Sequence, residues 1–202
     1  YQTVAALQAG KDMKMGATSL DGNFALGDMT VAYVMGLDAK VVTGYTGVAP
    51  VVLSMEQGET MGMLMPISTA YASVVAGRIK PLFVVGTKRS DLYPDVPALS
   101  EIVSASGDKK TLLEVWDGLG QSYHTFATPG IPADRVKYLQ ETAAAVMADP
   151  TFQSEIDKIS GYHVTTYING KDLGEAVAKV AKLGADAKST FDMLTQRYAA
   201  TQ

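Results

Sequence analysis

The sequence predicts an α/β protein with parallel strands, and three observations support this prediction. Short apolar or β-branched runs alternate with helix-forming segments along roughly the first half of the chain. Single helices between successive strands imply parallel pairing within one sheet. Hydrophobic residues make up 47% of the 202 residues and charged residues 19%, which is typical of a globular protein that buries a sizeable core. This composition excludes intrinsic disorder.

Local patterns define the first four elements. Residues 3–9 have helical composition and end at Gly10, a residue common at helix C-termini. Residues 13–16 are a short strand candidate. Apolar residues recur at helical spacing over residues 24–35, which predicts a helix after a polar turn. The β-branched run over residues 40–45 predicts a buried strand.

The same alternation continues through the next four elements. Residues 48–57 predict a helix, because Pro50 is tolerated in a first helical turn. A strand is expected at 60–65, a helix at 68–76 and a strand at 82–85. Residues 1 to about 110 therefore form a compact α/β unit, as expected for such an alternating pattern.

The second half has a different balance of elements. Its polar, turn-rich start at residues 104–111 predicts a surface loop or linker. We expect, in order, an extended segment at 119–126, a rigid turn at 128–132, helices at 133–148 and 151–160, a strand at 162–168 and a long helix at 171–198. The two expected strands are too few to cover the three expected helices. The second half therefore resembles part of a domain whose other strands come from elsewhere.

Composition excludes several kinds of partner. The net charge is −4 and the basic residues are scattered, whereas phosphate binding needs clustered Lys and Arg. We therefore expect no nucleic-acid partner. The apolar runs are far shorter than the roughly 18–20 residues that span a bilayer. We therefore expect a protein that is not membrane-embedded. The chain begins without the charged and apolar regions of a signal peptide, so an exported protein would be present here in a mature or truncated form.

Catalytic and metal-binding patterns are missing from the sequence. The chain has no cysteine, which rules out zinc ribbons, disulfides and thiol catalysis and suits an oxidising compartment. Its two histidines, His124 and His163, have no metal-site spacing. The nucleophile-elbow, Walker and dinucleotide-binding motifs are absent. We expect a protein that is not an enzyme and needs no cofactor or metal.

Seven motifs occur in a specific order along the chain. They are GATSLDGN at 16–23, YTGVAP at 45–50, GETM at 58–61, AGRIKPL at 76–82, YPDVP at 93–97 with Glu101, WDGL at 116–119 and TPGIP at 128–132. In this order they resemble the solute-binding components of tripartite tricarboxylate transporters, the Bug family. The resemblance implies a periplasmic-binding-protein-like fold of two α/β lobes with parallel-rich sheets.

The resemblance also implies a domain division and a role. Residues 1–115 correspond to the ligand-binding domain two, and residues 116–202 to the C-terminal part of domain one. The front of domain one has no counterpart, so domain one is expected to be incomplete. The implied function is periplasmic capture of a small di- or tricarboxylate for membrane transporter subunits, by hinged closure of the lobes. Presentation of a ligand to a membrane sensor kinase, or binding of a non-carboxylate molecule, remains an alternative.

The candidate ligand-binding residues precede helices. Helix N-termini bind anions because their first N–H groups are unpaired and carry the positive end of the helix dipole. In the turn at 16–23, Ala17, Thr18, Ser19 and Asn23 offer backbone approach and polar donors. On local sequence alone, plain helix capping is the better explanation of such residues. The family resemblance favours a ligand site.

Two further pairs of residues also stand between an expected strand and the helix that follows it. They are candidates because ligands of open α/β sheets collect at the carboxyl ends of strands. Tyr45 and Thr46 follow an expected strand, and Tyr45 is either a pocket wall or a core-edge residue. Ser68 and Thr69 are the first residues of the helix expected at 68–76. The hinge is expected near residues 112–122.

Two residues depart from the family pattern. Asp21 places a negative charge in the turn at 16–23, where it either caps the following helix or disfavours binding of an anion. Met61 stands where the family commonly has an acidic residue. Met61, Met63 and Met65 either pack in the core or make the pocket more apolar, and we expect them to pack in the core.

Overall fold

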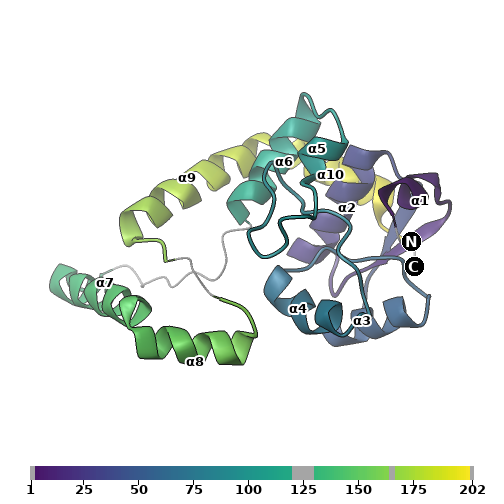
Figure 1. Ribbon diagram of the computed structural model, residues 1–202. Coiled ribbons are helices and arrows are strands. Elements are labelled where there is room, and N and C mark those ends of the chain that lie inside the picture. Colours follow the sequence, from purple (N-terminus) through teal and green to yellow (C-terminus); the bar gives the residue numbers. More distant parts are fainter. Residues whose placement is uncertain (1–2, 120–129, 164–166, 201–202) are drawn as a thin grey trace.

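The computed structural model describes residues 3–119, 130–163 and 167–200. Figure 1 shows a main body that contains both chain ends, with the helices of residues 133–186 extending away from it. The main body holds a small parallel sheet, a central helix behind it and shorter helices around it. This mixed α/β architecture with parallel strands agrees with the fold class that the sequence predicts.

Most expected elements of the first half occur close to their predicted bounds. The structure contains α1 (Val4–Ala9), β1 (Met13–Gly16), α2 (Asn23–Met35), β2 (Ala39–Val42), α3 (Val48–Glu56) and α4 (Ile67–Val75). Thr3 caps α1 through its side chain, which accepts a hydrogen bond from the backbone N–H of Ala6. The α2 helix ends at Gly36, whose φ of 69° lies in the left-handed region that a glycine adopts without strain. Local sequence signals therefore set these boundaries.

The sheet is parallel throughout. Strands β1 and β2 pair in parallel with Met13 opposite Ala39 and Gly16 opposite Val42. Two isolated parallel bridges extend the sheet on both sides, from Met15 to Gly62 and from Val41 to Ala199. The sheet thus joins four segments that are far apart in the sequence.

Two expected strands are wrong. Residues 60–65 and 82–85 form only isolated bridges, at Gly62 and at Val84. Met61 is 39% exposed, and Met63 and Met65 are half-buried, so the methionines do not pack in the core as expected. The backbone of this segment pairs with β1 at one point and is then held by a side chain of α2, which ends the strand pattern.

The expected loop at 104–111 and the expected hinge near 112–122 also need correction. Residues 108–119 form helix α6 (Asp108–Leu119), preceded by the short α5 (Leu99–Ile102). Leu112 and Leu113 are fully buried, and the Trp116 indole N–H donates to Thr30 Oγ1 at 3.1 Å. An acidic residue in the first turn favours a helix start, so the polar residues here begin a helix. Its buried face makes residues 112–116 part of the core, whereas residues 120–122 lie outside the described residues.

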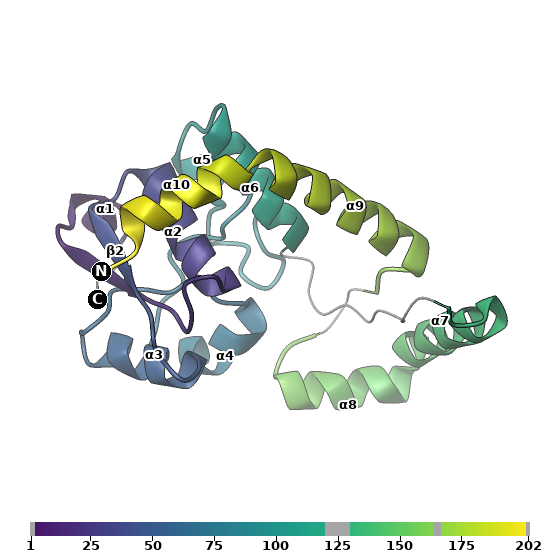
Figure 2. The same ribbon diagram turned by 180° about the vertical axis from the view of Figure 1, so that it is seen from behind.

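Helix α2 is the centre of the core. Nine of its residues are buried, because it lies between the sheet on one side and α6 and α10 (Lys188–Tyr198) on the others. From the opposite view, Figure 2 shows α10 running alongside α2. Leu194 and Tyr198 of α10 join this core, and the Lys40 ammonium donates to the Arg197 carbonyl at 2.6 Å. The last helix of the chain is therefore packed into the first α/β unit.

The remaining helices of the second half contribute less to the core. They are α7 (Ala133–Ala148), α8 (Pro150–Ser160) and α9 (Gly170–Asp186), and none of them buries a residue. Helix α9 packs on α6, and α7 packs on α8. Tyr138 is 67% exposed and Ile159 is 82% exposed. This agrees with the expected shortage of sheet in the second half.

Three expectations concern this region. The long helix expected at 171–198 is broken at Ala187 into α9 and α10. The expected strand at 162–168 includes residues 164–166, outside the described residues, and the described residues beside them belong to no strand. The extended segment at 119–126 and the start of the turn at 128–132 also lie outside the described residues. The domain division at residue 115 remains a prediction.

An exposed ion pair fixes the loop before α5. The Arg89 guanidinium donates to both carboxylate oxygens of Glu101, at 2.7 Å in its shortest contact, and to the Pro94 carbonyl. Glu101 also accepts from the N–H of Ala98 at 2.9 Å. These hydrogen bonds, those of Arg89 first, lower the pKa of Glu101 from 4.5 to about 2. The ionised carboxylate therefore holds the segment between Arg89 and α5.

This lowered pKa predicts a loss of stability in acid. Since the folded-state pKa of Glu101 is depressed, its contribution is complete above the unfolded-state value near 4.5 and is lost as the pH falls toward about 2. We expect the difference in melting temperature between the wild type and Glu101→Gln to be constant above about pH 5 and to shrink below it. Thermal melts of both proteins from pH 7 to pH 2.5 check this. A difference that stays constant across the range would contradict the assignment.

Candidate functional site

The carboxyl edge of the parallel sheet brings three helix N-termini to one side of the molecule. Strand β1 leads into α2, strand β2 leads into α3, and the segment that bridges β1 at Gly62 leads into α4. Because these segments are parallel, the helices that follow them begin at the same edge. The residues before the helices are Gly22, Gly47 and Pro66, and none of the three provides a side-chain cap. No side chain of these three residues therefore caps the first N–H groups of α2, α3 and α4.

Backbone hydrogen bonds join the first two predicted segments. The N–H of Ala17 donates to the carbonyl of Val42 at 2.9 Å, and the N–H of Gly44 donates to the carbonyl of Thr18 at 3.2 Å. Ala17 is fully buried, whereas Thr18 is half-buried. Gly44 has a φ of 105°, which only glycine adopts readily. The turns that follow β1 and β2 are therefore one connected structure.

Tyr45 belongs to the same place. A side chain added at Gly16 would meet Val51 Cγ1 at 2.6 Å and the Tyr45 ring at 3.5 Å, so α3 and the tyrosine approach the end of β1 closely. Tyr45 is half-buried. The absence of a side chain at Gly16 allows this approach, and the sequence did not indicate it.

The polar turn before α2 faces solvent. Ser19, Asp21 and Asn23 are all exposed. The turn is tight, because a side chain at Gly22 would meet Ser19 Oγ at 2.7 Å. The residue that caps α2 is Gly22 rather than Asp21, so the capping role considered for Asp21 is wrong. Asn23 is the first residue of the helix itself.

The other predicted residues lie at the starts of α3 and α4. Thr46 is exposed and directly precedes the cap residue of α3. Ser68 and Thr69 are exposed in the first turn of α4, where the N–H of Thr69 donates to the Pro66 carbonyl at 3.0 Å. The fold places them at the same edge, but among the described residues no side-chain hydrogen bond joins them to the turn at 16–23. Their role in a site remains a prediction.

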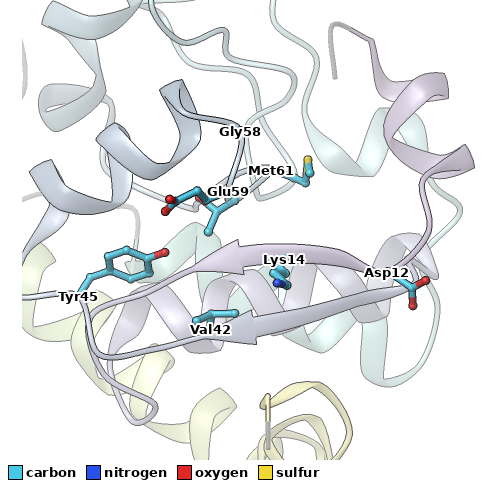
Figure 3. A pocket seen from close by; sticks show the side chains of 8 residues that line it. Asp12, Lys14, Val42, Tyr45, Gly58, Glu59 and Met61 are labelled. Carbon is cyan, nitrogen blue, oxygen red and sulfur yellow. The ribbon is translucent and has the colours of Figure 1, made fainter. Parts of the chain in front are cut away.

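A shallow depression of about 560 Å³ lies beside this edge, over the exposed face of the sheet. Figure 3 shows Tyr45 reaching into it from one side, with Lys14 of β1 and the Glu59 side chain around it. Of the predicted residues only Tyr45 lines it. Asp12 and Glu59 bring two carboxylates against the single ammonium of Lys14, so the depression does not suit an anion. The sheet edge is the better candidate for an anion site.

Asp28 is a residue that the sequence analysis missed. Its side chain is fully buried in α2, and its Oδ1 accepts from the N–H of Leu64 at 2.6 Å. Burial raises its pKa well above 3.8, against the smaller opposite effect of the Leu64 hydrogen bond. The available signal was an aspartate inside the apolar run from Phe24 to Met35.

No metal centre is found in the described part of the chain. His163 Nδ1 lies 2.6 Å from Asp157 Oδ2 in an exposed pair, and His124 lies outside the described residues. No group of three potential metal ligands occurs among the residues described. None of the described helices is long and apolar enough to cross a membrane.

Comparison with protein families gives one match. The model of the tripartite tricarboxylate transporter family receptor (TctC) matches residues 10–179. None of the curated proteins matches the chain in sequence.

Comparison with solved structures gives the same fold. An R. palustris protein solved with adipate superposes with a TM-score of 0.64 at 19% identity, over 97% of this chain and 62% of that one. A TctC solute-binding protein from Polaromonas has a TM-score of 0.59 at 19% identity, over 98% of this chain and 62% of its own. The periplasmic binding protein BugD has the same TM-score and identity, over 96% and 62%. The chain thus spans about 62% of the length of these proteins.

Proposed function

This chain belongs to the tripartite tricarboxylate transporter receptor family, and from that premise we propose that it captures a small carboxylate in the periplasm for membrane transporter subunits. The family is one of solute-binding receptors rather than of enzymes. One solved relative was crystallised with adipate, a dicarboxylate. The observation that carries the proposal is the group of three uncapped helix N-termini at the carboxyl edge of the sheet.

The geometry of that edge suits a carboxylate. Uncapped N–H groups and the positive ends of three helix dipoles favour an anion without a buried lysine that would hold it too tightly. In the proposed site Ala17 and Thr18 contribute backbone, and Tyr45 forms a wall. Hydroxyl and amide donors come from Ser19, Asn23, Thr46, Ser68 and Thr69. Asp21 is exposed and does not cap α2, so its charge is left to solvent.

The mechanism that we propose is closure of two lobes over the ligand. Residues 1–115 form the lobe that carries this edge, and residues 116–202 contribute to the other. The packing of α10 on α2 and β2 ties the end of the chain to the first lobe. The connection between the lobes then follows α6, because residues 112–116 are helical and buried on one face.

A thermal-shift screen of this chain tests the proposal. Adipate, succinate and citrate are the probes, and glucose and lysine are the controls. A ligand at a hundredfold excess over its Kd stabilises the folded state by about 2.7 kcal/mol. For a chain of this size that raises the melting temperature by about 5–11 °C. We expect a saturable shift with one or more of the carboxylates alone.

The outcomes separate the possible roles. A shift with glucose or lysine but with no carboxylate would contradict an anion site. A shift with none of them would contradict capture by this chain alone. A carboxylate shift supports the binding function, and transport itself is then measured as uptake that depends on the membrane subunits.

A further inference from the structure

Two neighbouring residues of α2, Gly27 and Asp28, contact the segment that leads into α4. A side chain at Gly27 would meet the Leu64 side chain at 2.0 Å, so only a glycine lets Leu64 lie this close to the helix. Next to it, the Asp28 carboxylate accepts the backbone N–H of the same residue at 2.6 Å. Packing and hydrogen bonding thus act on one residue from two adjacent positions.

This contact comes at a point where the sheet no longer guides the chain. The segment is tied to β1 by the N–H of Met61, which donates to the Lys14 carbonyl, and by the Gly16 N–H, which donates to the Gly62 carbonyl. Two residues beyond Gly62 the N–H of Leu64 turns to Asp28, and α4 begins at Ile67. The direction of α4 is therefore set between Gly62 and Ile67.

We propose that Asp28 is a positioning residue that fixes the start of α4 at the carboxyl edge of the sheet, and thereby orients Ser68 and Thr69 toward the ligand. This inference rests on the proposed carboxylate site and adds to it a buried residue that does not touch the ligand. The position is five residues into α2, about 7–8 Å along the helix from Asn23 at 1.5 Å per residue.

The chemistry of Asp28 suits this role beside an anion. Its Oδ2 is buried and has no hydrogen-bond partner among the described residues. A buried carboxyl group in this state favours its neutral form, and its pKa is raised by burial. In its neutral form the carboxyl group accepts the Leu64 N–H through its carbonyl oxygen and places no negative charge near a bound carboxylate.

Amide hydrogen exchange, followed by mass spectrometry over peptides spanning residues 62–70, tests the positioning role directly. Asp28→Val removes the acceptor, and Asp28→Asn retains an oxygen for the Leu64 N–H. Thr30→Val is the matched control, because Thr30 is also buried in α2 and its hydroxyl bonds to Trp116 and to the Leu26 carbonyl. We expect exchange over 62–70 to be at least about tenfold faster in Asp28→Val and within about threefold of wild type in the other two variants.

Binding of adipate, succinate and citrate gives a second readout. A carboxylate that the wild type binds is expected to bind about tenfold more weakly to Asp28→Val and with unchanged affinity to Asp28→Asn and Thr30→Val. Equal exchange over 62–70 in Asp28→Val and Thr30→Val would overturn the inference. If the wild type binds none of the three probes, the proposed function fails, and the exchange experiment still decides whether Asp28 positions α4. Asp28→Ala replaces the valine variant if that protein does not fold.

Discussion

Replacing Leu194 by alanine is expected to lower the free energy of unfolding by about 2–5 kcal/mol. Leu194 is fully buried in α10, which packs on α2 and β2. Its truncation leaves a cavity between the last helix of the chain and the central helix of the first α/β unit. For a protein of this size the melting temperature falls by about 2–4 °C for each kcal/mol. Thermal and urea denaturation measure the effect.

The control for this prediction is Leu139→Ala on α7. Leu139 is 55% exposed, so the same change there is expected to alter stability by no more than about 0.5 kcal/mol. Similar small effects at both positions would show that α10 does not belong to the core of α2 and β2. In that case the division at residue 115 would separate two independently packed units.

Replacing Asn23 by aspartate is expected to affect stability and ligand binding in opposite directions. Asn23 is the first residue of α2, where a negative charge stabilises the helix by about 0.3–1 kcal/mol through its interaction with the helix dipole. The same charge repels a bound carboxylate. A Coulomb energy of about 1–3 kcal/mol between this charge and a carboxylate bound at the start of α2 weakens binding about 5- to 150-fold. Isothermal titration with a carboxylate that binds the wild type, together with thermal melts, measures both effects.

Asn169→Asp is the matched control, since Asn169 caps α9 through its side-chain oxygen at another helix N-terminus. Affinity is expected to stay at the wild-type value in this variant. If Asn23→Asp binds the carboxylate as tightly as the wild type, the ligand does not lie at the start of α2. A loss of affinity in both variants would indicate a general effect of net charge.

Glycines and apolar periodicity made several elements of the chain predictable. Residues 13–16 and 133–148 form the strand and the helix that their patterns predict, with the same bounds. Parallel pairing followed from the alternation of strands and helices, because a single helix between two strands imposes a crossover. Local patterns were sufficient where a segment had one strong preference.

Local patterns were not sufficient where a tertiary contact determined the backbone conformation. Residues 60–65 were expected to form a strand, but the Asp28 carboxylate accepts the Leu64 N–H and the pairing with β1 ends there. Residues 108–111 look like a loop, but they begin α6, whose next residues are buried against α2. In both cases the partner is distant in the sequence, so no local window contains the signal.

The candidate site shows the same division. The sequence alone determined the family and the residues that precede each helix, because small and polar turn residues at strand ends have a local pattern. Only the tertiary structure decided that α2, α3 and α4 begin without side-chain caps at one edge of the sheet. It also decided that α10 closes the core and that a buried aspartate holds the approach to α4. These features depend on contacts between residues far apart in the chain, which form only when the sheet brings its four segments together.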